Sequence, residues 1–306
     1  MSLTWPSPAL RVIERGWLSS NQLLCWDEDG ATVVDTGYVT DGAETLRLID
    51  AALAGRPLRR IVNTHLHSDH AGGNALLQDR HGCAIWIPPG EHEAVAAWDE
   101  DRLSYRATSQ LCPRFHPDHV FQPHDTLRLG GEDWTVLPAQ GHDHAMVMLW
   151  CDRLGILASA DALWQKSFGV IFPELAGVSG FAEQAATLDL IADLDPAWVI
   201  PGHGAPFHKV APSLAAARSR LQWLQDEPQR HTEHALKVLL AFKLLEARRM
   251  TLTDLTGVVQ ASRDAMAGLR AHLSNDVAAL AAGLAEQLVR SGVATWQDGH
   301  LLARTG

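Results

Sequence analysis

The chain has 306 residues, of which 46% are hydrophobic and 20% are charged, a composition typical of a soluble globular protein. No apolar stretch approaches the roughly 20 residues that a membrane-spanning helix needs, so we expect no membrane partner. The formal net charge of −11 argues against general binding of nucleic acid by the whole chain.

The N-terminus and the cysteines favour a cytoplasmic protein. The opening residues, MSLTWPSPALRVIERG, lack a charged region followed by an apolar core, so we predict no signal peptide. The four cysteines contain no CxxC pair and are typical of free thiols in a reducing compartment. They are Cys25, Cys83, Cys112 and Cys151.

Residues 31–141 alternate strand-like and helix-like segments. Short β-branched or apolar runs predict strands, and spacings of three and four between apolar residues predict a helix. The predicted segments are strands at 31–37, 58–65 and 83–88, a helix at 42–55, and a hairpin at 125–141 that turns at Gly130-Gly131. Between them, residues 90–118 are irregular and partly helical, which makes this segment a candidate lid.

Residues 145–208 continue the alternation. Two strands are expected in 145–161, a helix in 181–196, and a strand followed by a loop in 197–204. Intermixed strands and helices throughout residues 1–208 predict an α/β arrangement around large sheets.

The pattern changes at about residue 209. Amphipathic helices are predicted at 234–249, 251–260 and 276–292, and a hairpin at 292–304, which is the order of a winged helix. Residues 1–208 carry 13 Lys and Arg against 27 Asp and Glu, whereas residues 209–306 carry 12 against 9. We therefore predict two domains, 1–208 and a small winged-helix-like domain at 209–306.

The stretch NTHLHSDHAGG, residues 63–73, is the densest candidate for a metal site. It follows a predicted strand, so alternate side chains of extended chain can face one side. His65, His67 and Asp69 would then point together, and the following turn would bring His70 to them. Imidazole and carboxylate groups suit zinc, iron and manganese.

Three further candidates stand where predicted strands end: His142 in AQGHDH, Asp161 in LASADAL and His203 in IPGHGAP. Together with the first four residues they make five imidazoles and two carboxylates. That number suits a dinuclear centre with one bridging carboxylate and a bridging water.

These motifs together resemble the metallo-β-lactamase superfamily. THLHSDHAGG resembles its T-H-x-H-x-D-H-x-G-G signature, and VVDTG, GHDH, SAD and PGHG resemble its remaining motifs in the expected order. The resemblance covers roughly residues 10–208. It implies an αββα sandwich with two divalent metal ions at one edge between two sheets.

The resemblance also implies a role for each matching residue. The first metal would be held by His65, His67 and His142, and the second by Asp69, His70 and His203, with Asp161 bridging them. Asp69 could also hold a proton during turnover. Asp35 would orient a metal-binding histidine, although a simple turn residue is the alternative reading.

Two groups of histidines leave alternatives open. GHDH is shorter than the spacing usual in the family, so His144 could replace His142 as a ligand. The other group lies in the irregular segment and its surroundings, where histidines could line a substrate pocket or be solvated loop residues. These are His116, His119 and His124.

The predicted function is hydrolysis of an ester, thioester or similar small-molecule bond by a metal-activated water. Zinc is the first candidate for both ions. A bridging Asp161 is not typical of true β-lactamases in the superfamily. Trp164 stands where lactone-cleaving members commonly have a tyrosine, and Tyr38 and Tyr105 are the only tyrosines that could serve as in glyoxalase II. The complete ligand set disfavours the single-iron, oxygen-using members.

The C-terminal segment supplies the alternative. A winged helix after this domain resembles the subgroup that includes the mitochondrial β-lactamase-like endoribonuclease, and the local net charge of +3 permits RNA binding. However, the last predicted helix carries few Lys or Arg, whereas a surface that follows a nucleic-acid backbone would carry several. We expect this domain to cover the active site or to mediate a homodimer.

Overall fold

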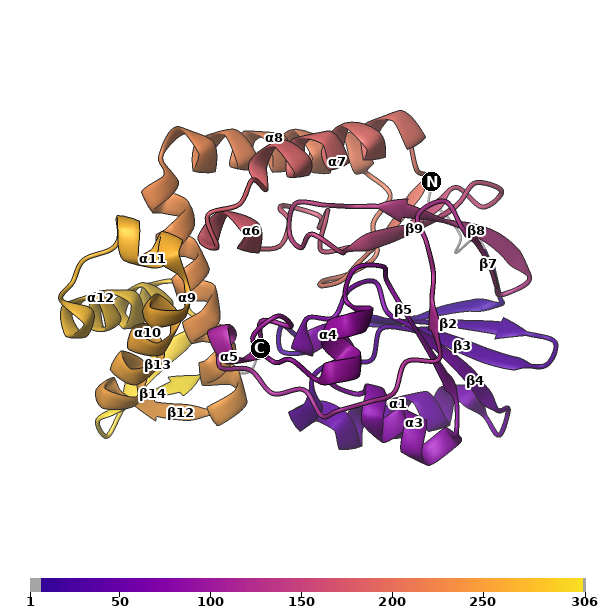
Figure 1. The fold of residues 1–306 in the computed structure, drawn as a ribbon, viewed down its shortest axis with the longest axis horizontal. Helices are drawn as coiled ribbons and strands as arrows, with labels where there is room; N and C mark the ends of the chain where they lie inside the picture. Colours follow the sequence, from indigo (N-terminus) through magenta and orange to yellow (C-terminus); the bar gives the residue numbers. More distant parts are fainter. Residues whose placement is uncertain (1–6, 305–306) are drawn as a thin grey trace.

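The computed structural model describes residues 7–304 and contains two large sheets packed face to face (Figure 1). The first sheet has six strands, in the order β1 (Leu10–Ile13), β2 (Gln22–Asp27), β3 (Gly30–Val34), β4 (Leu58–Val62), β5 (Ala84–Ile87) and β6 (His119–Val120). The first three strands are antiparallel, and β3 to β6 run parallel. Parallel strands end at one edge, so the residues that follow β3 and β4 lie close together.

The second sheet has five strands and ends at the same edge. Its order is β11 (Trp198–Pro201), β10 (Ile156–Ala160), β9 (Val147–Cys151), β8 (Glu132–Pro138) and β7 (Thr126–Leu129). Strands β10 and β11 are parallel neighbours, and the other pairs are antiparallel. Buried residues of both sheets form one core between them, which includes Val34 and Val62 of the first sheet and Trp134 and Leu149 of the second.

Helices cover the outer face of each sheet. On the first sheet lie α1 (Gly42–Leu53), α3 (Asn74–His81) and α4 (His92–Ala97), which share a core with β3 to β5. On the second sheet lie α7 (Phe181–Leu194) and α8 (Val210–Asp226). The layers are therefore helix, sheet, sheet and helix, which confirms the predicted αββα sandwich (Figure 1). The short elements are the 3₁₀ turn η1 (Val39–Asp41), α2 (Ser68–Ala71), α5 (Tyr105–Thr108) and α6 (Phe172–Leu175).

Helix α8 was not among the predicted helices. Its buried residues Leu214, Ala217 and Leu221 pack in the same hydrophobic core as Leu188 and Ile191 of α7. This packing groups α8 with the second sheet, so the change from one core to the next falls near Glu227, where α8 ends. The domain boundary at residue 208 stays a prediction.

The C-terminal helices and a small sheet form a further core, which also includes Val170 and Leu175 from the segment before α7. Its helices are α9 (Pro228–Ala247), α10 (Leu252–Ala265), α11 (Ala267–His272) and α12 (Val277–Arg290). Strands β13 (Ala294–Gln297) and β14 (His300–Ala303) form the expected hairpin, and β14 also pairs with β12 (Arg249–Thr251). Helices followed by a hairpin are thus present as expected, and assignment to the winged-helix class stays a prediction. Within residues 7–304, no helix combines the length and apolar character that a bilayer crossing requires.

A polar cluster attaches α9 to the first half of the chain. The Tyr38 hydroxyl donates to Glu246 Oε2 (2.8 Å) and accepts from the Leu111 amide (3.0 Å). Lys243 Nζ donates to Glu246 Oε1 (2.7 Å) and to the Ser109 carbonyl (3.0 Å). Phe242 packs edge-on against the buried ring of Tyr38. Helix α9 is therefore held beside the segment that was predicted as a lid.

Lowering the pH is expected to destabilise the fold through His231 of α9, whose ring packs edge-on against Phe181 of α7 with ring centroids 5.3 Å apart. Burial and the nearby Arg220 guanidinium lower the pKa of His231 to about 4. Only the unfolded chain therefore binds a proton as the pH falls below about 6.5, and stability is lost between about pH 6.5 and pH 4. At pH 5 this single group should cost about 2 kcal/mol of unfolding free energy.

Urea unfolding of metal-free protein at pH 7 and pH 5 measures this loss. The variant His231→Gln should lose about 2 kcal/mol less than the unsubstituted protein over this interval. The control His92→Gln removes an exposed histidine and should retain the full loss. Equal pH dependence in the His231→Gln variant and the unsubstituted protein would contradict the assignment.

Candidate metal centre

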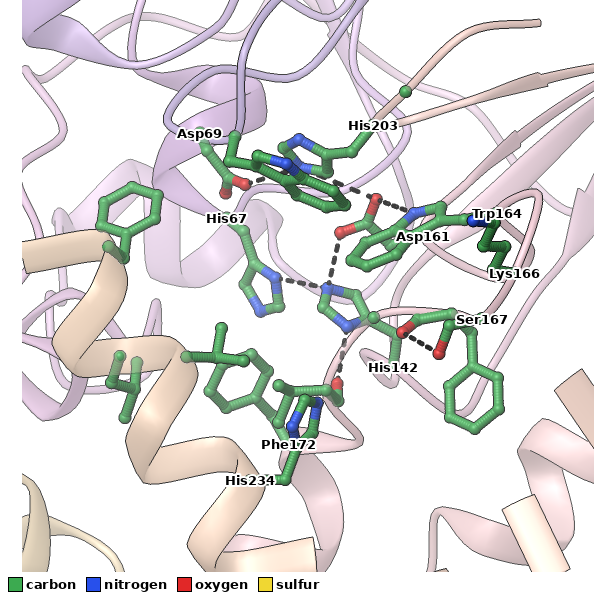
Figure 2. Close-up of a pocket in the computed structure, with 18 of the residues that line it drawn as sticks. His67, Asp69, His142, Asp161, Trp164, Lys166, Ser167, Phe172, His203 and His234 are labelled. Atoms are coloured by element: carbon green, nitrogen blue, oxygen red, sulfur yellow. Dashed lines mark hydrogen bonds and ion pairs between the residues drawn. The ribbon is translucent and has the colours of Figure 1, made fainter. Parts of the chain in front are cut away.

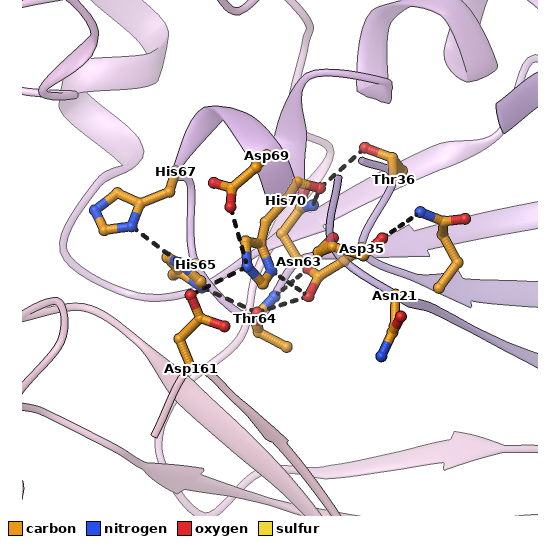
Figure 3. Close-up of polar contacts among 12 residues, drawn as sticks. Asn21, Asp35, Thr36, Asn63, Thr64, His65, His67, Asp69, His70 and Asp161 are labelled. Carbon is orange, nitrogen blue, oxygen red and sulfur yellow. Dashed lines mark hydrogen bonds and ion pairs between the residues drawn. The ribbon is translucent and has the colours of Figure 1, made fainter. Parts of the chain in front are cut away.

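The predicted HLHSDH segment lies at the edge where β4 ends. His65 and His67 are on the loop after this strand, and α2 begins at Ser68, so the chain turns directly after His67. Asp69 and His70 therefore lie on the first turn of a short helix. Figure 3 shows His65, His67, Asp69 and His70 converging, as expected for extended chain that enters a turn.

Three imidazoles form a first group. His65 Nε2 lies 3.1 Å from His67 Nδ1, which lies 2.8 Å from His142 Nε2. His142 is on the loop after β8 and comes from the opposite sheet. These three nitrogens all lie within 4.8 Å of one another.

Two carboxylates and two imidazoles form a second group, made of Asp69, His70, Asp161 and His203. His203 Nε2 lies 3.1 Å from Asp69 Oδ2. Asp161 directly follows β10, and His203 follows β11, so these parallel neighbours deliver both side chains to one edge. The structure thus brings together all seven predicted ligand residues.

Asp161 lies between the two groups. Its Oδ2 atom is 3.4 Å from His142 Nε2 and 3.6 Å from His70 Nε2, and its Oδ1 atom is 4.0 Å from His203 Nε2. The Trp164 indole N–H donates to Asp161 Oδ1 (3.1 Å). Trp164 thus orients the predicted bridging carboxylate with its indole donor (Figure 2).

Asp35 fixes the orientation of two of the histidines. Its Oδ2 atom accepts from His70 Nδ1 (2.8 Å) and from the Thr64 hydroxyl (2.8 Å), and its Oδ1 atom accepts from the Thr64 amide (2.9 Å) (Figure 3). Because the single Thr64 hydroxyl proton goes to Asp35, Thr64 Oγ1 accepts from His65 Nδ1 at 3.1 Å. In their neutral, metal-binding form both His65 and His70 therefore carry their proton on Nδ1 and present the Nε2 lone pair to a metal.

Contacts on the far side orient the remaining imidazoles of the first group. His142 Nδ1 donates to the Val170 carbonyl (2.6 Å), which leaves its Nε2 lone pair free. His67 Nε2 lies 3.6 Å from Asp143 Oδ2, on the side away from His65 and His142. Each of these imidazoles thus has an acceptor behind it and a free nitrogen in front, as in known metal-binding histidines.

Two glycines make room for the ligand side chains. A Cβ atom on Gly202 would collide with Asp161 Oδ1, and one on Gly169 would collide with His142 Nδ1. Gly202, the first glycine of PGHG, is therefore required because its backbone lies so close to the predicted bridging carboxylate of Asp161. Gly169 has the same role for His142, although no recognised motif contains it.

The electrostatics of the two groups differ. Burial and the neighbouring imidazoles lower the pKa of His65 well below its ordinary value, and the same causes lower the pKa of His67 to about 4. For His70, burial opposes protonation, but the carboxylates of Asp35, Asp161 and Asp69 outweigh it and raise the pKa. His65 and His67 are therefore neutral at pH 7, the state in which imidazole binds metals.

The donor set fits two divalent cations. Among the residues described, His70 Nε2 is a buried nitrogen with no hydrogen-bond partner, although the carboxylates of Asp161 and Asp69 lie 3.6 Å and 4.0 Å from it. An orphaned donor or acceptor in such a place is costly unless an ion occupies the site. Five imidazole nitrogens and two carboxylates also match the nitrogen and oxygen preference of zinc and iron.

The remaining candidate histidines lie outside both groups. The His144 side chain is 67% exposed and contacts Asp143 at 3.7 Å, so His142 and not His144 joins the first group. The other three histidines are exposed and do not line the pocket described below. This agrees with the prediction that they are solvated loop residues. They are His116, His119 and His124.

A pocket of about 610 Å³ opens beside the two groups (Figure 2). Its floor includes His67, Asp69, His142, Asp161 and His203. The predicted lid contributes Thr108 and Gln110, and α8 and α9 complete the wall with Arg220, His234, Val238, Leu239 and Phe242. These α8 and α9 residues were missed at the sequence level, because no motif marks a helix that approaches the site only in three dimensions.

Aromatic rings line the mouth of the pocket near the second group. Trp17, which is 61% exposed, stacks on His203 with ring centroids 5.5 Å apart and planes inclined by 13°. Trp164 meets Trp17 edge-on at 5.3 Å. The exposed Trp17 indole, stacked on the predicted metal ligand His203, gives the pocket mouth an apolar surface that suits an apolar part of a substrate.

Known proteins resemble the chain in sequence and in fold. A model described as the metallo-beta-lactamase superfamily matches residues 15–203. A hydroxyacylglutathione hydrolase from Rhodobacter capsulatus is 29% identical over 180 residues, which cover 58% of this chain and 60% of that relative. The chain therefore spans less than two thirds of this relative's length.

Solved structures share the fold, two of them over nearly all of the chain. A beta-lactamase domain protein from Burkholderia ambifaria has a TM-score of 0.59 at 22% identity, covering 98% of this chain and 94% of its own. A metallo-beta-lactamase family protein from Thermus thermophilus has a TM-score of 0.56 at 19% identity, covering 97% and 99%. A third protein, solved in a di-iron-bound form, has a TM-score of 0.54 at 23% identity, covering 68% and 98%.

Proposed function

The chain belongs to the metallo-β-lactamase superfamily, and we propose that within it this protein is a dinuclear hydrolase that cleaves an ester or thioester of a small molecule. The observation that carries the proposal is the convergence of seven ligand side chains on the floor of a pocket of about 610 Å³. The hydroxyacylglutathione hydrolases among its relatives support hydrolysis of this kind.

We propose that two divalent cations occupy the two groups. The first would be held by His65, His67 and His142, the second by Asp69, His70 and His203, and both by Asp161. Zinc remains the first candidate. Iron is the second, because one structural neighbour was solved in a di-iron-bound form. When bound, such cations would lower the pKa of a shared water from about 15.7 towards 7 and polarise the scissile carbonyl.

The chain's own residues would then orient the substrate and handle protons. Asp69 lines the pocket and engages His203 through Oδ2, while its Oδ1 atom has no hydrogen-bond partner among residues 7–304. We assign Oδ1 as the transient acceptor of a proton during turnover. Trp17 and the wall formed by α9 would exclude bulk water from the reacting group and bind its apolar part.

A small molecule is the preferred substrate because α9 forms part of the pocket wall and narrows the access to the site. The alternative, RNA binding by the C-terminal domain, lacks support from charge. Glu286 and Arg290 are the charged residues of α12, whereas a backbone-binding helix would present several cations. We also propose that the protein forms a homodimer and is located in the cytoplasm. The four free, buried cysteines fit a reducing compartment.

Elemental analysis followed by a substrate panel tests the proposal. We expect two equivalents of zinc, iron or manganese per chain, and turnover of 4-nitrophenyl acetate or S-lactoylglutathione that stops on chelation. The panel should include bis(4-nitrophenyl) phosphate and single-stranded RNA. RNA cleavage without turnover of any ester or thioester would overturn the proposal in favour of the nucleic-acid alternative.

A further inference from the structure

The pocket has an apolar wall that the seven ligand residues do not explain. Phe168, Val170 and Phe172 contribute from the segment before α7, and Val238, Leu239 and Phe242 contribute from α9. Apart from Asp69 and Asp161, which belong to the metal groups, no described residue that lines the pocket is acidic. The substrate-facing wall therefore suits an apolar chain or ring and carries no negative charge of its own.

Arg220 stands in this wall without a counter-ion among the residues that the structure describes. It lies on α8, is partly buried, and makes no hydrogen bond or ion pair with any residue from 7 to 304; its guanidinium lies 5.4 Å from the centre of the Trp223 ring. Burial lowers its pKa, and no nearby carboxylate raises it. Arg15 provides a comparison, because its side chain is also buried but its guanidinium has a counter-ion, with Asp41 Oδ2 3.7 Å from its Nη2 atom.

A partly buried guanidinium without a counter-ion is unfavourable, so the fold keeps this charge at a cost. Arg218, two residues earlier on the same helix, is exposed and pairs with Asp189 at 2.7 Å. The helix thus has an acidic partner for the arginine that faces solvent and none for the arginine that faces the pocket. An anionic ligand would supply the missing partner.

Two further residues of the pocket lining, His234 and Lys166, favour the same kind of ligand. Burial and the Arg220 charge lower the pKa of His234 to about 3, so this imidazole is neutral at pH 7 and can donate one hydrogen bond to an oxyanion. Lys166, also in the pocket lining, is exposed and has no ion pair among the described residues. Figure 2 shows His234 near Phe172, on the opposite side of His67 and His142 from Asp69 and His203.

We propose that Arg220 binds an oxyanion of the substrate, so that the preferred substrates are esters or thioesters whose apolar body carries a carboxylate or phosphate away from the reacting carbonyl. This inference rests on the proposed hydrolase function. The carbonyl would lie over the seven ligand residues, the apolar body against Phe172 and α9, and the oxyanion on Arg220, with His234 as a second donor.

Matched ester pairs test the specificity. Mono(4-nitrophenyl) succinate, adipate and suberate each carry one free carboxylate, and their methyl esters are the neutral counterparts. The metal-loaded protein should prefer the anionic member of at least one pair by about 10- to 100-fold in kcat/KM, as expected for a charge-assisted contact. Arg220→Met should bring this ratio close to one, whereas the control Arg218→Met should retain it.

Calorimetric titration of metal-free protein provides a readout that is independent of turnover. Monomethyl adipate and hexyl phosphate serve as the two oxyanion probes, and either should bind to the unsubstituted protein and to Arg218→Met but not to Arg220→Met. Whichever probe binds identifies the class of oxyanion. Equal binding by Arg220→Met, or a kcat/KM ratio near one for all three pairs in the unsubstituted protein, would overturn the inference.

The two failures can be told apart. If the metal-loaded protein hydrolyses neutral and anionic esters equally, the hydrolase proposal stands and the role of Arg220 falls. If it hydrolyses no ester and no thioester, the hydrolase proposal falls, and calorimetry still decides whether Arg220 binds an oxyanion.

Discussion

Replacing Asp161 with alanine is expected to remove both the bound metal and the hydrolytic activity. The Asp161 carboxylate reaches both groups, with Oδ2 3.4 Å from His142 Nε2 and 3.6 Å from His70 Nε2. Without it, two cations would lack the carboxylate that offsets their mutual repulsion. We expect metal content to fall from two equivalents to one or fewer, and kcat/KM to fall by at least about 100-fold.

His67→Ala should give the same double loss, because it removes the central nitrogen of the first group. The matched control is His144→Ala, which removes an exposed imidazole two residues from His142 and should retain both metal and turnover. Metal is measured by elemental analysis after desalting, and folding by circular dichroism. Full metal occupancy with full turnover in either the Asp161 or the His67 variant would refute the ligand assignment.

Most of the metal site could be predicted because its residues lie at strand ends. Alternating strand and helix patterns located β3, β4, β10 and β11, and a polar residue directly after a strand falls at the sheet edge whatever the details of packing. Asp35 and Asp161 directly follow their strands, and His203 follows β11 after a single glycine. The position of the site therefore follows from local sequence once the sheet order is known.

The substrate side of the pocket could not be predicted in the same way. Arg220 and His234 lie more than 15 residues beyond the last motif, on α8 and α9, and only tertiary packing brings them to the sheet edge. Helix α8 is rich in alanine and contains Pro212, so its apolar pattern is weak and it was overlooked. Trp164 differs again, since its position was recognised but its indole contact to Asp161 depends on side-chain geometry.

Asp35→Asn is expected to weaken metal binding without changing a ligand. The Asp35 carboxylate accepts three hydrogen bonds: two from Thr64, through its amide and its hydroxyl, and one from His70 Nδ1. An amide has one acceptor oxygen, so in either orientation its NH₂ group would face a donor. The least costly relief is a shift of the His70 proton from Nδ1 to Nε2, which would block the lone pair that faces the second group. Metal affinity should therefore fall by about 10- to 100-fold, and the free energy of unfolding by about 1–3 kcal/mol.

A loss of metal affinity in Asp35→Asn would not result from backbone strain, so it would report on the hydrogen bonds of Asp35. Asp35 has a φ of +58°, in the left-handed region that asparagine tolerates at least as well as aspartate. Competition with a chelator gives the affinity, and ¹⁵N NMR of the imidazoles reports the tautomer of His70. Asp41→Asn is the control, since Asp41 accepts from Ser19 Oγ at 2.7 Å and contacts no predicted ligand residue. An Asp35→Asn protein with unchanged affinity would mean that the His70 tautomer is set by the metal alone, and that the hydrogen bonds from Asp35 serve only the fold.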